Sequence, residues 1–185
     1  MFPFVLMSSV VVGLVAFAGP SQGHELRPAV ADVTVTQSEI RVELILAVET
    51  LLAGIDLTEV IDTDDAPQAE IYDQLRSLSE QELVSLVRLE WPLLASGFLL
   101  EGAGPLSLVD VEVISEANLD LPRDTRLIMR ANLPPGSGSV SLGWIARNGG
   151  LVVRHGDSND AYAAFLDGGE LSAPLPREGA VVESL

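Results

Sequence analysis

Apolar and polar residues alternate along most of the chain after residue 23, and this period of two predicts β-strands. The clearest stretch is "SEIRVELILAVET", in which the polar face carries Arg41, Glu43 and Glu49. Its apolar face consists of Ile40, Val42, Leu44, Leu46 and Val48. Five further stretches alternate in the same way: "VADVTVT", "LVDVEVI", "TRLIMRANL", "SVSLGWIA" and "GLVVRH". The apolar faces predicted for the first four are Ala31, Val33 and Val35; Val109, Val111 and Val113; Leu127, Met129, Ala131 and Leu133; and Val140, Leu142 and Trp144.

Turn-forming residues separate these stretches. Gln37-Ser38 predicts a short turn between the first two strands, and "RNGG" contains the Asn-Gly pair that is typical of two-residue hairpins. Six short strands joined by turns predict a mainly β fold. We expect an antiparallel β-sandwich of the Ig-like type, with a helical insertion around residues 66–96.

The insertion is predicted from the stretch "TDDAPQAEIYDQLRSLSEQELVSLVRLEWPLL", which does not alternate. Ser79 followed by Glu82 is a capping-box pattern, which predicts that a helix begins there. Leu83, Leu86, Val87 and Trp91 then recur at helical spacing. We expect Pro92 to end or kink this helix. Asp65 or a neighbouring residue is predicted to cap an earlier helix that begins near Pro67.

The first 23 residues, "MFPFVLMSSVVVGLVAFAGPSQG", carry no charged side chain and predict a signal peptide. Small residues suit cleavage after Ala18 or after Gly23, and an uncleaved N-terminal anchor is the alternative. We therefore expect a signal peptide at 1–23, a folded domain at 24–176 and a flexible tail at 177–185. The predicted location is the periplasm, or the extracytoplasmic side of a membrane.

Charge and composition narrow the function classes. The 185-residue chain has 27 acidic and 10 basic residues, a formal net charge of −17, and all its basic residues are arginine. Such a surface repels phosphates, so nucleic acid is not expected as a partner. Because the chain has no cysteine, disulfides, thiolate metal sites and cysteine nucleophiles are excluded.

The two histidines, His24 and His155, suggest a metal site. If cleavage follows Gly23, the terminal amine and the ring of His24 can form a copper "histidine brace" with the ring of His155. Asp157, with Asp160 nearby, can supply an oxygen ligand, and Cu or Ni would suit this donor set. The alternative is that His24 is a solvated terminal residue and that His155 lies at a strand end, on the face of Leu151 and Val153.

Other chemistries find less support in the sequence. The acidic run from Asp62 resembles a calcium loop, but Pro67 occupies the sixth position, which requires glycine, and Asp73 the twelfth, which requires glutamate. His155, Asp157 and Ser158 are close in sequence, but a triad is defined by its geometry in space, and no G-x-S-x-G elbow is present. On one strand face Glu43 and Glu49 would lie roughly 20 Å apart, too far to act on one bond. We expect no enzyme.

Several segments, taken in order, resemble the extracytoplasmic N-terminal region of long HupE/UreJ-family bacterial membrane proteins. These segments are "GHELRPAVADVTV", "VELILAVETLLAGIDL", "DTDDAP…YDQLRSL", "LPRDTRLIMRANLPPG" and "LGW…GLVVRHGDSNDAYAAFLDGGELSAPLPREG". The resemblance covers the chain from His24 to about residue 179. It implies a soluble periplasmic domain with membrane transporter subunits and a metal ion as partners, in a context of nickel handling. That family's transmembrane helices and its His- and Asp-bearing nickel motif are not in this sequence, so no transport residue is carried over.

The main hypothesis is therefore a non-enzymatic exported domain that serves a membrane transporter by binding a metal or by docking on membrane subunits. A copper oxidase or other histidine-brace protein that uses His24 and His155 is the second hypothesis. The third is a purely structural or assembly domain.

Overall fold

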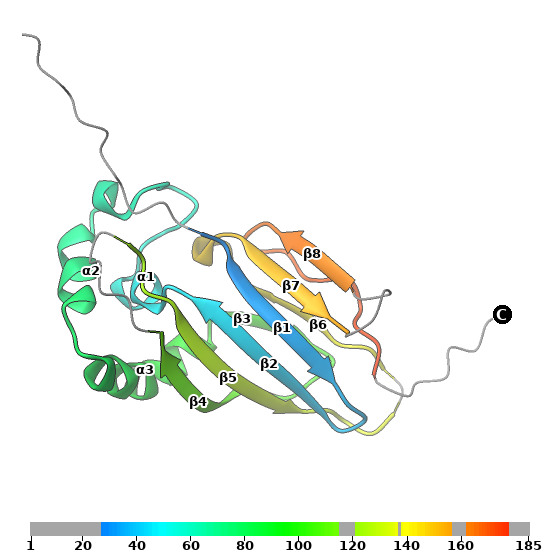
Figure 1. Cartoon of the computed structure of the whole chain (residues 1–185). Coiled ribbons are helices and arrows are strands. Elements are labelled where there is room, and N and C mark those ends of the chain that lie inside the picture. The colour runs from blue at the N-terminus through cyan, green and yellow to red at the C-terminus, as the bar shows by residue number, and fades with distance from the viewer. Residues whose placement is uncertain (1–26, 115–120, 137, 157–161, 178–185) are drawn as a thin grey trace, which may run out of the picture.

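The computed structural model describes residues 27–114, 121–136, 138–156 and 162–177, and the fold is mainly β (Figure 1). The strands in these ranges are β1 (Ala29–Val35), β2 (Glu39–Leu46), β3 (Phe98–Glu101), β4 (Ser107–Val113), β5 (Thr125–Asn132), β6 (Ser141–Trp144), β7 (Leu151–His155) and β8 (Tyr162–Leu166). The helices are α1 (Val48–Ala53), α2 (Ala69–Arg76) and α3 (Glu80–Ala95), with short 3-10 turns η1 (Thr63–Asp65) and η2 (Ala146–Asn148). The mainly β prediction is confirmed.

Six strands form one open sheet in the order β4-β5-β2-β1-β7-β8. All its neighbours are antiparallel except β1 and β7, which run parallel. A separate two-stranded sheet pairs β3 with β6, and single bridges from Leu171 and Leu175 extend it along β6. The sheet does not close into a barrel, and the three helices gather at one end of it (Figure 1).

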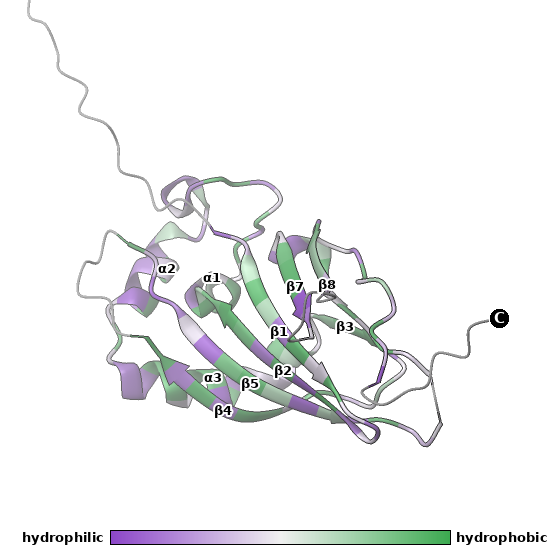
Figure 2. Ribbon diagram, turned by 45° about the vertical axis from the view of Figure 1, so that its right-hand side comes forward, coloured by the Kyte–Doolittle hydropathy of each residue, from purple (hydrophilic) through white to green (hydrophobic). Residues whose placement is uncertain are grey.

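The buried faces of the alternating strands form a core to which the six-stranded sheet, the two-stranded sheet and α3 all contribute. Ile40, Val42 and Leu44 of β2 are fully buried, and their cross-strand neighbours on β1 and β5 are buried with them. Trp144 of β6 and Val87 of α3 belong to the same core. Figure 2 shows hydrophilic and hydrophobic residues alternating along the exposed sheet. Burial of one face of each strand is the main driving force for this arrangement.

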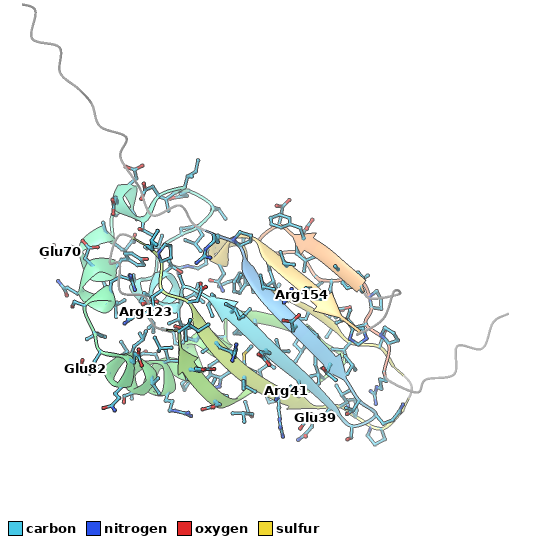
Figure 3. All side chains as sticks on the ribbon, in the orientation of Figure 1. Glu39, Arg41, Glu70, Glu82, Arg123 and Arg154 are labelled. Carbon is cyan, nitrogen blue, oxygen red and sulfur yellow. The ribbon has the colours of Figure 1, made fainter. Side chains whose placement is uncertain are left out.

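Ion pairs between neighbouring strands cover the outer face of the large sheet. Asp32 of β1 pairs with Arg154 of β7, and Glu43 of β2 pairs with Arg126 of β5 at 3.1 Å. Arg154, Arg41 and Glu39 lie on this face in Figure 3. The paired side chains are between one-third and one-half exposed, so each pair contributes little to stability, but the pairs match the register of the strands.

The chain leaves the predicted second strand earlier than alternation indicated. β2 ends at Leu46, and α1 begins at Val48. Glu49 therefore lies on a helix and is fully buried, so its predicted place on the solvated strand face beside Glu43 is wrong. A short strand carries no signal of its own that distinguishes its last residues from the first turn of a helix.

The helical insertion is present, and its details differ from the prediction. Ser79 and Glu82 form the expected capping box, with the Ser79 amide donating to Glu82 at 2.9 Å. Pro92 does not end α3, which continues to Ala95. Packing of the helix on the core outweighs the hydrogen bond that proline removes. The prediction that Asp65 or a neighbour caps the next helix is wrong, because α2 has Gln68 at its N-cap and no side-chain cap.

Two predictions about strands and turns also need correction. A bulge between Leu108 and Asp110 turns Val109 outward, so that it is 45% exposed, whereas Val111 and Val113 are buried. The "RNGG" segment does not form a hairpin: it begins within η2 and belongs to the connection from β6 in the small sheet to β7 in the large one. Arg177, the first residue of the predicted tail, is buried and donates to the carbonyls of Gln37, Pro134 and Gly138, and the rest of the predicted tail, residues 178–185, lies outside the described ranges.

Candidate functional site

His155 is the only residue of the predicted metal site within the described ranges; His24 and Asp157 lie outside them. His155 is the last residue of β7 and is half-buried on the face of Leu151 and Val153. Its Nδ1 lies 2.9 Å from the Val33 carbonyl oxygen. A neutral ring that donates from Nδ1 to this carbonyl leaves Nε2 as the free lone pair, which is the usual arrangement of a metal-binding histidine. Among the described residues, no group of three His, Cys, Asp or Glu side chains is placed to hold a metal ion.

A buried cluster of charged side chains joins α1, α2 and the segment before β5. Glu49 is fully buried, and Arg76 and Arg123 are 5% and 6% exposed. Arg123 donates from Nε to Glu49 Oε1 at 2.8 Å, and Arg76 Nη1 lies 3.7 Å from the same oxygen. Figure 3 shows Arg123 pointing in among the helices.

The same arginines also satisfy backbone carbonyls. Arg123 donates to the carbonyls of Leu75 in the last turn of α2 and of Leu78 in the link to α3, and Arg76 donates to that of Leu121. The cluster thus connects two helices to the segment that enters β5. Its hydrogen bonds hold the helices in place, and it lines neither of the two hollows described below.

Beside this cluster, Tyr72 of α2 packs in a small second core with Ile55 and Ala66. Its ring is fully buried. Burial raises the pKa of the Tyr72 phenol to about 12. The side chain therefore stays neutral at physiological pH and serves packing.

The first hollow, which we call the strand-end pocket, lies where β1 begins and β2 ends. Its volume is about 420 Å³, and its apolar walls include Leu57, Ile61, Trp144 and Phe165. Trp144 Nε1 donates to the Gly149 carbonyl at 2.8 Å, so this donor is occupied. The pocket offers mainly apolar contact, with one half-exposed ion pair, Arg27 and Asp124, on its wall.

The second hollow, the helix groove, lies between α1, α2, α3 and η2 and has a volume of about 410 Å³. Its apolar walls are Leu51 and Leu52 of α1, Ile71 and Leu75 of α2, Leu86, Leu93 and Leu94 of α3, and Ile145. Two of these side chains remain well exposed, Ile71 at 50% and Leu93 at 69%. Leu89, one turn before Leu93, is 72% exposed and extends this apolar surface along α3.

Charge is concentrated on the same helical part of the molecule. Residues 48–96 contain eleven acidic residues and two arginines, a net charge of −9 out of the total of −17. Both arginines are engaged in ion pairs, Arg76 with Glu49 and Arg88 with Asp110. In Figure 3, Glu70 and Glu82 point outward from this end of the molecule.

The sequence pattern places Leu86 on a helix but does not predict the groove that it lines. The available signal was that "LVSLVRLEWPLL" is apolar around more than one face, whereas a helix packed on one side needs a single apolar stripe. The buried Glu49 cluster had no such signal, because the alternation of β2 continues through Val48.

No helix in the described part of the chain is long and apolar enough to span a membrane. No family model matches the chain, and no curated protein matches it either.

Proposed function

We propose that this chain is an exported, non-enzymatic docking domain that binds a membrane protein partner on the extracytoplasmic side. The observation that carries the proposal is the helix groove, where leucine and isoleucine side chains of three helices line one hollow and remain exposed at Ile71 and Leu93. Contiguous exposed apolar side chains on a soluble domain mark interaction sites.

Two features of the sequence support the rest of the proposal. The uncharged N-terminal stretch of 23 residues favours export, and the resemblance to the extracytoplasmic region of HupE/UreJ-family proteins favours a transporter as the partner. An Ig-like sandwich is the finer architecture that we propose. It is supported by the single core to which both sheets contribute.

Site-specific photo-crosslinking in the native host tests this function. A photoreactive side chain at Leu93 is expected to give an adduct with a protein of the membrane fraction. The matched control carries the same group at Thr34, which is exposed on the outer face of β1. Absence of an adduct from Leu93, or equal adducts from both positions, would reject docking through the groove and favour a purely structural domain.

A metal-binding role is the second candidate, and the environment of His155 favours it. Donation from Nδ1 to the Val33 carbonyl would leave Nε2 as the nitrogen for a metal ion. Native mass spectrometry of the exported protein, with copper and nickel supplied, reports the mature N-terminus and any bound metal together. A chain that begins at His24 and retains one metal ion, lost in His155→Ala, is the expected result. A metal-free chain would reject this role.

A further inference from the structure

We propose that the occupant of the helix groove is a basic amphipathic helix of a partner protein. This inference rests on the proposed docking function and adds the chemistry of the partner: a leucine-type apolar stripe facing the groove and a lysine- or arginine-rich face outside it. Helix-in-groove recognition of this kind uses apolar anchors at successive turns.

Helix α3 contributes an apolar stripe to the groove wall. Leu86, Glu90, Leu93 and Leu94 line the groove at spacings of three and four residues, so one stripe of the helix faces it. The buried stripe of α3 is a different one, with Leu83 and Val87 at 0% exposure. The helix thus has a core face and a second apolar face that the described residues cover only in part: Leu86 and Leu94 are half-buried, whereas Leu93 is exposed.

The charges around the groove favour a partner of positive charge. Glu90 of α3 lines the groove, and the helical part of the chain around it, residues 48–96, carries a net charge of −9. The basic side chain on the groove wall, Arg147, donates to the Gly54 carbonyl at 2.6 Å. Acidic groups around an apolar hollow favour a cationic partner and speed its association.

The same charges disfavour two other occupants. A second copy of this chain would bring two helical regions of net charge −9 together, and like charges across an interface oppose binding. A bilayer with anionic headgroups would be repelled for the same reason.

The walls of the groove are already held in position. Arg123 and Glu49 tie α1 to the end of α2, and Arg147 ties η2 to the end of α1. A preformed groove loses little conformational entropy when a partner binds. Since α3 has 16 residues, a partner helix of about the same length, roughly 24 Å, matches it.

Binding of a synthetic peptide to the purified domain tests the inference. The probe is a leucine–lysine peptide of about 18 residues with an amphipathic helical pattern. Its controls are a scrambled peptide of the same composition and a version with glutamate in place of lysine. We expect the amphipathic basic peptide to bind at least about tenfold more tightly than either control, as measured by fluorescence anisotropy. Affinity should also fall as salt screens the charges.

Matched variants locate the binding site. Leu93→Asp is expected to weaken binding about tenfold or more, because it places a charge in the apolar contact. Ile61→Asp makes the same kind of change at an 84%-exposed side chain on the strand-end pocket, and it should leave binding unchanged. Glu90→Lys reverses the charge on the groove wall and should weaken binding without removing an apolar anchor. Circular dichroism melting of each variant verifies that it is folded.

Equal binding of the scrambled peptide would overturn the inference, since it would reduce recognition to net charge alone. Equal loss from Ile61→Asp and Leu93→Asp would also overturn it. The outcome is separable from that of the proposed function. Groove-specific peptide binding without a cellular adduct from Leu93 would show that the groove selects basic amphipathic helices and would reject a membrane protein as the partner. An adduct without peptide binding supports the function and overturns the inference.

Discussion

Glu49 is the most informative position for a stability test, because the structure buries a carboxylate that alternation had placed in solvent. In Glu49→Gln the side chain keeps its shape but loses its charge, which removes the buried carboxylate that pairs with Arg123 and Arg76. Removing one partner of a buried ion pair costs about 3–5 kcal/mol. For a domain of this size, such a loss lowers Tm by about 6–20 °C.

Glu43→Gln is the matched control. The sequence pattern placed Glu43 on the same strand face as Glu49, but in the structure Glu43 lies on the outer face of the large sheet. Glu43 pairs with Arg126 at 3.1 Å and with Arg41 at 3.4 Å, and these side chains are about one-third exposed. Exposed pairs contribute about 1 kcal/mol or less, so this variant should stay close to the parent in stability.

Urea unfolding of the parent and both variants, followed by far-ultraviolet circular dichroism, gives the free energies of unfolding. The reasoning requires Glu49→Gln to be less stable than Glu43→Gln by at least about 2 kcal/mol. Equal losses in the free energy of unfolding for the two variants would mean that Glu49 is solvated. Glu49 would be solvated if strand β2 continued beyond Leu46 in place of helix α1.

Three further predictions follow from buried groups and close contacts. Because burial raises the pKa of Tyr72 to about 12, the contribution of its neutral phenol to stability is complete below about pH 10 and is lost as the pH rises toward 12. The chain has no lysine or cysteine, so Tyr72→Phe should remove most of the fall in the free energy of unfolding at alkaline pH. An unchanged alkaline slope in this variant would contradict the burial of Tyr72. Gly143→Ala should destabilise the protein by about 1–3 kcal/mol or prevent folding, since the added Cβ would lie 2.0 Å from the Glu170 carbonyl oxygen. In the control Gly138→Ala the added Cβ has no atom within 4 Å, so thermal melts should show unchanged stability. Arg177→Ala should cost about 1–3 kcal/mol in urea unfolding because three backbone carbonyls lose their donor, and an unchanged midpoint would place Arg177 in the tail after all.

Local patterns predicted the elements well where one face of a strand meets the core. Ile40, Val42 and Leu44 and the facing residues of β1 and β5 are buried as alternation indicated. The capping box at Ser79 and Glu82 was also correct, because such a cap depends on residues within one turn. Alternation failed at Val109, where a bulge adds one residue and reverses the faces. Strands β3 and β8 were missed because their sequences, FLLE and YAAFL, do not alternate between apolar and polar residues.

The candidate site was harder to predict than the fold. The helix groove needs three helices to meet, and sequence gives the faces of each helix without their mutual placement. The predicted metal site depends on His24 and Asp157, which lie outside the described residues, so it stays a prediction. What the structure adds is that His155 presents one ring nitrogen next to the Val33 carbonyl.

The sequence by itself determined the mainly β character, the capped helix, the acidic surface and the exclusion of cysteine chemistry, because each of these depends on composition or on residues close along the chain. Only the tertiary structure decided the parallel pairing of β1 with β7, the burial of Glu49 against Arg123, and the groove between the helices. The physical reason is the distance along the chain: 74 residues separate Glu49 from Arg123, and their contact depends on how the whole core packs.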